Sequence, residues 1–284
     1  MKKIITLFAI MAGLTGYAQP KILNQAIITT KTTVVSPEGD EAPAQSITSE
    51  GGEQVRVMRF GGDGESKTTT WLKNDMMKTF SESEMGRSTV IRDNAKKLTT
   101  TIMEMMGRKT GFYATDADQE EMRKRMDSMM QSRNQTASFG AQARNAEYNI
   151  EYKDETKKIA GYECKRALII ASRGNGRKDT TTVWYCPDFK IQGISSTGGS
   201  LGGFGGFVNQ SSGTTGMEIL NGFPMQYERI MNRGRKMTVE VTKLVLDKEI
   251  ADKEFEIPKD IEVKAMKDMQ NGGGPGTVQI RVGG

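Results

Sequence analysis

Histidine is absent from the 284 residues of this chain. Histidine is the usual general base near neutral pH, so its absence excludes Ser-His and Cys-His nucleophile arrangements. A serine hydrolase would then need a Ser-Lys pair, and no Ser-x-x-Lys motif occurs. Two distant carboxylates could still act as a glycosidase pair, but Asp252, Glu254 and Glu256 lie on one face of an expected strand, as solvated residues ordinarily do. We therefore predict no enzyme activity, no catalytic residue and no cofactor.

Motifs for phosphate, calcium and nucleic acid are also missing. The glycine-rich segment 195–216 has no Gly-Lys-Ser/Thr ending and no following helix pattern, so we expect a mobile surface loop. The turn at 61–64 lacks the further oxygen ligands of a calcium loop. The formal net charge of +5 is scattered along the chain without an aromatic and basic platform. Nucleic acid is therefore excluded as a partner.

Long apolar runs are missing too, except at the N-terminus. Residues 1–3 are basic at two positions, residues 4–14 are apolar, and residues 16–18 offer small residues for cleavage after Ala18. This pattern predicts a secretory signal peptide over residues 1–18, because the run is too short for a membrane span. We expect a soluble mature protein that is periplasmic or secreted, without a transmembrane segment.

Cysteine is scarce, and its two copies flank one turn. Two β-prone runs surround Gly174-Asn175-Gly176, which predicts a hairpin. If Asn175 is the middle of a three-residue turn, Cys164 faces Cys186 directly, at a separation that a disulfide can bridge. A two-residue turn would place the two sulfurs on opposite faces. The other possibility is two buried free thiols.

The predicted export favours the disulfide between Cys164 and Cys186, because disulfides persist in oxidising compartments. In the same register Arg166 lies opposite Trp184, which predicts a cation–π pair.

Residues 111–130 change from a strand period to a helix period. Asp116 and Asp118 favour a helix start, and a methionine stripe follows at the spacing i, i+4, i+7 and i+8. The stripe consists of Met122, Met126, Met129 and Met130.

About ten short strands without β-α-β alternation predict a mainly β chain with antiparallel strands. A sheet of that length must curl, and we expect the methionine helix to pack on its concave side. The expected strands include 22–35, 55–60, 67–73, 76–81, 89–92, 98–106, 148–152, the two hairpin arms, 217–220, 222–228, 237–245 and 253–257. We expect one β-rich domain over 19–264 and a flexible glycine-rich tail over 265–284.

Several short stretches resemble the GLPGLI family and its related domain of unknown function, which are exported proteins of Bacteroidota. The resemblance spans about residues 22–264, although Asn-Gly-Phe-Pro-Met stands where the family has Gly-Leu-Pro-Gly-Leu. It implies a half-barrel fold like that of the periplasmic lipoprotein carriers LolA and LolB, and it transfers no catalytic residue. The stretches are Ile91-Arg92-Asp93, Met106-Gly107-Arg108-Lys109, Gly161-Tyr162-Glu163-Cys164, Val183-Trp184-Tyr185, Gly222-Phe223-Pro224-Met225 and Phe255-Glu256-Ile257-Pro258.

A curled sheet around a helix encloses an apolar groove, so we predict a binding protein of the cell envelope that holds a lipid, acyl chain or hydrophobic peptide. The chain has 19 methionines against 10 phenylalanines, and methionine gives an adaptable lining, although it also fills ordinary cores. The candidate groove residues are Met122, Met126, Met129, Met130, Trp71 and Trp184.

Two other functions stay open. One is an envelope scaffold that presents sheet edges or the 195–216 loop to a partner protein. The other is a periplasmic Cu(I) binder, because thioethers suit Cu(I). Its candidate ligands are Met103, Met105 and Met106, or Met122 and Met126.

Overall fold

The computed structural model describes residues 19–37, 46–48, 54–56, 64–83, 86–105, 107–132, 147–172, 176, 178–191, 216–230 and 234–269. The predicted signal peptide, the turn residue Asn175 and nearly all of the 195–216 loop lie outside these residues. The predicted tail is described only up to Met269.

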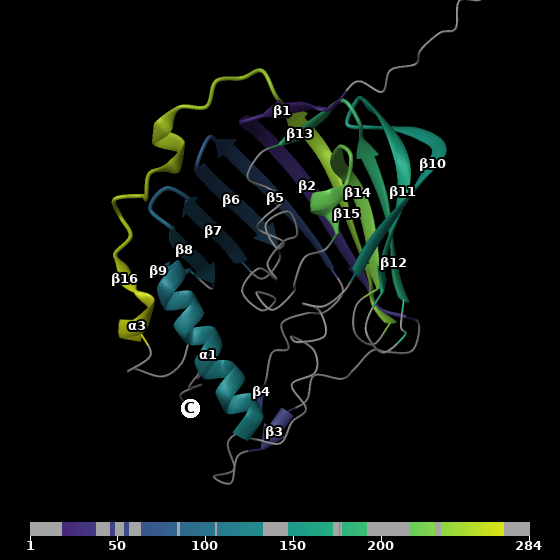
Figure 1. Ribbon diagram of the computed structural model, residues 1–284. Helices are drawn as coiled ribbons and strands as arrows, with labels where there is room; N and C mark the ends of the chain where they lie inside the picture. The colour runs from purple at the N-terminus through teal and green to yellow at the C-terminus, as the bar shows by residue number, and fades with distance from the viewer. Residues whose placement is uncertain are drawn as a thin grey trace, which may run out of the picture.

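One large sheet dominates the described fold, and Figure 1 shows that it curls without closing into a barrel. All neighbouring strands are antiparallel except β9 and β16, which are parallel. This confirms a mainly β chain with a large curled sheet. In spatial order the twelve strands are β10 (Glu147–Ile159), β11 (Tyr162–Ser172), β12 (Lys178–Cys186), β14 (Phe223–Ile230), β15 (Lys236–Val245), β2 (Gln25–Val35), β5 (Gly64–Lys73), β6 (Met76–Ser83), β7 (Gly86–Asp93), β8 (Leu98–Met105), β9 (Arg108–Thr115) and β16 (Val263–Ala265).

Two small sheets and four helical segments complete the described elements. A parallel pair joins β1 (Lys21–Leu23) to β13 (Phe189–Ile191), and an antiparallel pair joins β3 (Ser46–Thr48) to β4 (Gln54–Arg56). The helical segments are α1 (Asp116–Ser132), α3 (Met266–Met269) and the 3-10 turns η2 (Met217–Ile219) and η4 (Asp252–Phe255).

Two expected strands, 217–220 and 253–257, are wrong, because they contain η2 and η4 instead. Met217 and Leu220 are three residues apart, the repeat of a 3-10 turn, and both pack on one apolar cluster. In η4 the buried side chain is Phe255, at 7% exposure. Short apolar runs can be buried by a single turn, and their sequence does not distinguish a turn from a strand.

Strand register defines the two faces of the sheet. Figure 1 shows η2 inside the curl, and Leu220, the residue after η2, belongs to the same buried cluster as Val183, so Val183 lies on the concave face. Val183 pairs with Tyr227, Tyr227 with Val239, and Val239 with Thr32. Directly opposed residues point to the same side of a sheet, and residues two apart share that side. The concave face can therefore be followed from β11 across to β9.

The convex face is charged along the same strands. Lys31 forms an ion pair with Glu65 at 2.5 Å, and Arg87 forms one with Glu82 at 2.9 Å. All four residues alternate with concave side chains on β2, β5, β6 and β7. The pattern of a wet outer face and a buried inner face follows from this alternation.

The segment after β15 crosses to the far edge of the sheet, as Figure 1 shows. The ammonium group of Lys73 donates to the carbonyl of Ile250 at 2.8 Å and to Asp252 at 2.7 Å. Near the other end Lys109 pairs with Asp260 at 3.1 Å. These contacts lead the chain to β16, which adds the parallel edge strand.

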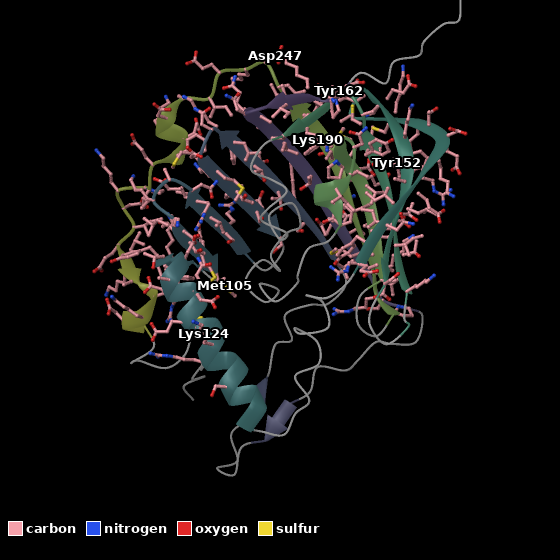
Figure 2. The ribbon with its side chains drawn as sticks, in the orientation of Figure 1. Met105, Lys124, Tyr152, Tyr162, Lys190 and Asp247 are labelled. Carbon is pink, nitrogen blue, oxygen red and sulfur yellow. The ribbon has the colours of Figure 1, made fainter. Side chains whose placement is uncertain are left out.

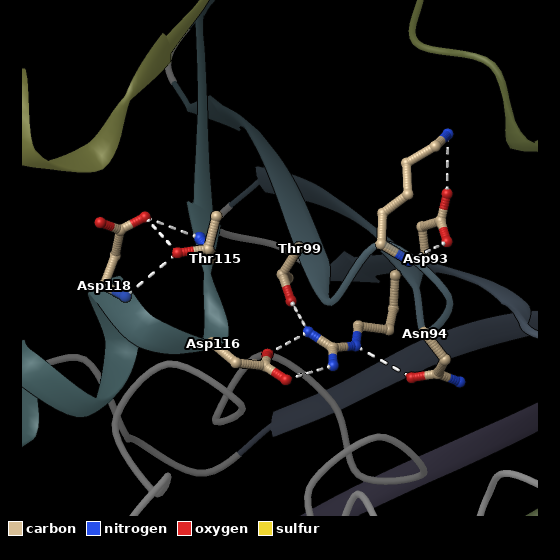
Figure 3. Close-up of polar contacts among 8 residues, drawn as sticks. Asp93, Asn94, Thr99, Thr115, Asp116 and Asp118 are labelled. Atoms are coloured by element: carbon tan, nitrogen blue, oxygen red, sulfur yellow. Dashed lines mark hydrogen bonds and ion pairs between the residues drawn. The ribbon is translucent and has the colours of Figure 1, made fainter.

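Helix α1 confirms the predicted helix, and side-chain caps fix its start (Figure 3). The backbone N–H and hydroxyl of Thr115 donate to Oδ2 of Asp118 at 2.9 and 2.6 Å, and the Asp118 N–H donates to the Thr115 hydroxyl at 3.2 Å. This reciprocal arrangement is a capping box. The principal contacts of α1 are with β9, and Figure 1 shows the helix continuing past the strand ends toward β3 and β4.

A bidentate ion pair ties the first residue of α1 to the sheet. The guanidinium of Arg92 on β7 donates to both carboxylate oxygens of Asp116, at 2.5 and 2.9 Å (Figure 3). The same guanidinium also donates to Asn94 and Thr99, at 3.0 and 3.1 Å. The hydrogen bond from Arg92 lowers the pKa of Asp116 below 3.8.

We predict that Asp116→Asn lowers the free energy of unfolding by about 1 kcal/mol near neutral pH. The bidentate geometry strengthens the ion pair with Arg92, but partial exposure of the Asp116 carboxylate weakens it. A lowered folded-state pKa stabilises the fold above the unfolded value of 3.8, and this stability is lost as pH falls through the lower folded value. Urea unfolding of both proteins from about pH 7 to about pH 2 should show the difference shrinking at acid pH.

The double variant with Arg92→Gln measures the coupling between these two side chains. If Asp116→Asn and Arg92→Gln act additively, the pair contributes nothing and this account of the helix start is wrong.

Candidate functional site

An apolar surface covers the concave side of strands β10 to β14. Its strand residues pack with Met217 of η2 and with Leu220, which follows η2, and Figure 1 shows η2 inside the curl. We call this set of residues the apolar wing. It consists of Ala167, Ile169, Val183, Tyr185 and Leu220, with the partly buried Tyr148, Ile150, Met217 and Tyr227 around them.

Aromatic contacts hold η2 against the wing. The hydroxyl of Tyr152 accepts a hydrogen bond from the Asn221 N–H at 2.9 Å, and the Tyr152 ring packs edge-on against Tyr185 at 5.4 Å. Figure 2 shows Tyr152 on the side of the curl opposite Met105 and Lys124. The apolar wing and helix α1 therefore lie at opposite margins of the concave face.

The floor of the concave face is lined with hydroxyl groups. Six threonine and serine side chains on β2, β5 and β6 share this face by register, and each is at most 8% exposed. Two directly opposed pairs have oxygens within hydrogen-bonding range, Thr68 with Ser81 at 2.9 Å and Thr70 with Thr79 at 3.4 Å. We call this set the hydroxyl floor: Thr30, Thr32, Thr68, Thr70, Thr79 and Ser81.

Thr32 stands where the hydroxyl floor meets the apolar side of the sheet. It pairs with Val239 on β15 and with Ser66 on β5. The Thr32 side chain is 6% exposed, and its Oγ1 atom has no hydrogen-bond partner among the described residues. A buried hydroxyl without a partner is costly, so this atom is poised to accept or donate a hydrogen bond.

Charge is separated between the two faces of the central strands. On β2, β5 and β6 the concave residues are hydroxyl-bearing, apolar or glycine, whereas Lys31, Lys67 and Glu82 alternate with them on the convex side. On the concave face of β14, burial raises the pKa of Tyr227 to about 12, and Arg229 opposes that shift. The Tyr227 phenol is therefore neutral near pH 7.

The methionine stripe is only partly described. Met122 is partly buried on α1. Met126, Met129 and Met130 belong to the same helix, but their side chains lie outside the described part of the chain. Their predicted role in a groove stays a prediction.

The two tryptophans do not line the apolar wing. Trp71 pairs with Ile27 and Lys78, all on the convex side, and the Lys78 ammonium lies 5.4 Å from its ring. Trp184 lies next to Val183 in sequence and therefore points away from the wing. The prediction that these residues share a concave groove is wrong, because strand parity places them on the other side.

The predicted register of the cysteine hairpin is confirmed, but its cation–π pair is wrong. Arg166 does pair with Trp184 across the strands. Its guanidinium, however, donates to both carboxylate oxygens of Glu155, at 2.8 and 2.9 Å. The cation over the Trp184 ring is Lys157, 4.4 Å from the centroid. A carboxylate within reach is a stronger partner for a guanidinium than a ring face.

The predicted disulfide is also wrong in this structure, because Cys164 and Cys186 are free and buried. The Cys164 thiol lies 3.5 Å from the Tyr162 carbonyl on its own strand. Burial raises the pKa of Cys164 to about 11 and that of Cys186 to about 12, so both stay protonated near neutral pH. Register brings two cysteines together, but it does not set the side-chain torsions that a disulfide requires.

The hydroxyl floor is the feature that sequence reasoning missed. Threonine is common in strands, so its presence alone carries little information. Threonine also fills positions 29, 33 and 69, so the sequence carries no clear alternation. Only the pairing of β2 with β5 shows which of these threonines share the concave face.

The described residues contain no group of three or more histidine, cysteine or carboxylate residues arranged to hold a metal ion. None of their helices combines the length and the apolar character needed to cross a bilayer.

Comparison with known proteins gives a family match and distant structural likenesses. The family model of DUF4412, a domain of unknown function, matches residues 55–261. This match does not show the GLPGLI family. No curated protein matched the chain.

Among solved structures, PNGF-II in two crystal forms is 13% and 14% identical, with TM-scores of 0.35 and 0.33. These matches cover 87% of this chain but 32% and 33% of PNGF-II, so the chain spans about a third of that protein. An outer membrane lipoprotein-sorting protein domain from Vibrio parahaemolyticus is 8% identical with a TM-score of 0.26, over 82% of this chain and 89% of that one. Likenesses at these scores carry no conclusion about function.

We predict that neither thiol of the native protein reacts with iodoacetamide at about pH 8, because both raised pKa values keep the thiolate fraction low. In denaturant without reductant, mass spectrometry should then find both cysteines alkylated. Unmodified cysteines in denaturant, made reactive only by a reductant, would show a disulfide and contradict the free-thiol assignment.

Proposed function

The chain belongs to the DUF4412 family, and we propose that it is an exported, non-enzymatic binding protein of the cell envelope. In this proposal the concave face of the curled sheet holds the apolar part of a lipid, an acyl chain or a hydrophobic peptide. The single observation that carries the proposal is the exposed Ile219 of η2, which lies beside the apolar wing inside an open sheet.

The geometry supports a ligand of this kind in two ways. The twelve-stranded sheet curls but does not close into a barrel, so no ring of paired strands encloses its concave face (Figure 1). Inside the curl, η2 keeps Ile219 at 52% exposure. An exposed isoleucine next to the wing offers apolar contact to a ligand, and each buried methylene contributes about 0.8 kcal/mol.

The other parts of the proposal rest on the sequence. The N-terminal pattern of a basic start, an apolar run and small residues before Ala18 supports export. The absence of histidine supports a role in binding rather than in catalysis.

We predict that the delipidated protein binds a fluorescent C16 acyl probe and that Ile219→Asn weakens this binding about tenfold, because a polar group replaces an apolar contact. Ile230→Asn is the matched control. Ile230 is 67% exposed. It pairs with Lys236, which pairs with Val35, and this register places Ile230 on the convex side. Titration of probe fluorescence gives the dissociation constant of each protein, and the constant of Ile230→Asn should equal that of the wild type.

Failure of the wild-type protein to bind the probe would overturn the proposed function. Equal losses in the two variants would place the binding surface elsewhere. Native mass spectrometry of protein purified from the envelope fraction identifies any ligand that copurifies.

A further inference from the structure

We propose that the ligand carries an uncharged, hydroxyl-rich polar group, as a monoacylglycerol does, and that this group lies against the hydroxyl floor. This inference rests on the proposed function, because it assigns the polar end of an amphiphile whose apolar end contacts the wing. Val239 joins the two surfaces on the concave face, because it pairs with Tyr227 of the wing on one side and with Thr32 of the floor on the other.

The hydroxyl floor recognises hydrogen-bonding groups without supplying charge. Each hydroxyl can both donate and accept a hydrogen bond. On β2, β5 and β6 the concave side chains include no lysine, arginine, aspartate or glutamate. A phosphate or carboxylate placed there would be desolvated without a counter-charge, which is far more costly than desolvating a hydroxyl.

Thr32 supplies the second observation that points to a ligand. Its Oγ1 is buried without a hydrogen-bond partner among the residues described, whereas the hydroxyls of Thr68 and Ser81 lie 2.9 Å apart. A ligand hydroxyl at this boundary would satisfy Thr32. A purely apolar ligand would leave it unsatisfied.

Arg229 offers a rival site for an anionic group. It lies two residues from Tyr227 on the concave side of β14, and it is exposed near the end of that strand. It pairs with Met237, which pairs with Val34, so it lies two strands away from β2. An anionic amphiphile would place its headgroup at Arg229, and the experiment distinguishes that site from the hydroxyl floor.

The test compares two amphiphiles with one acyl chain, 1-palmitoylglycerol and 1-palmitoylglycerol 3-phosphate, each below its micelle concentration. They compete with the fluorescent C16 probe for the delipidated protein. We expect the neutral lipid to bind at least tenfold tighter, because the buried phosphate lacks a counter-charge. The variant Thr32→Val should weaken the neutral lipid about fivefold, which corresponds to one lost hydrogen bond.

Thr29→Val is the matched control on the same strand. Thr29 is 8% exposed on the convex side, where its hydroxyl lies 3.4 Å from that of Thr69. This variant should leave both lipids unaffected. Thermal unfolding provides a second readout: Thr32→Val should be as stable as the wild type or more so, because it removes a buried hydroxyl without a partner.

The outcomes separate the two proposals. Binding of the C16 probe without preference between the two lipids would overturn this inference and leave the proposed function standing. A preference for the phosphate that Arg229→Gln removes would also overturn it. Failure of the probe and of both lipids to bind would overturn the proposed function itself.

Discussion

The antiparallel register that runs from β11 to β9 is the constraint on which the rest of the structure depends. Because directly opposed residues share a face, a few pairs connect the apolar wing to the hydroxyl floor: Val183 with Tyr227, Tyr227 with Val239, and Val239 with Thr32. A slip of one residue in any of these strands would exchange the concave and convex sets. The same register places ion pairs such as Lys31 with Glu65 on the outside.

An open sheet of this size needs support at its margins, and the chain provides it with long-range contacts. Arg92 holds the start of α1 beside β9 through a bidentate pair with Asp116. Lys73 and Lys109 hold the segment that leads from β15 to the edge strand β16. These contacts tie α1 and the segment that leads to β16 to the strands of the large sheet.

Local patterns predicted much of this fold, and long-range geometry accounts for what they missed. The glycine and asparagine turn predicted the pairing of Arg166 with Trp184, and the change of period predicted α1. Which face of a strand turns inward depends on partners far away in sequence, so Trp71 was assigned to the wrong side. The hydroxyl floor was missed for the same reason, because Thr32 and Thr68 become neighbours on one face only through the pairing of β2 with β5.

Methyl NMR of the protein with a spin-labelled acyl chain tests the central claim most directly. The concave-face account predicts that the label broadens the methyl signals of Ile169, Val183 and Val239, which line that face, while Ile230 and Val35 on the convex side keep their intensity. Broadening confined to the convex methyls, or spread evenly over both faces, would contradict it.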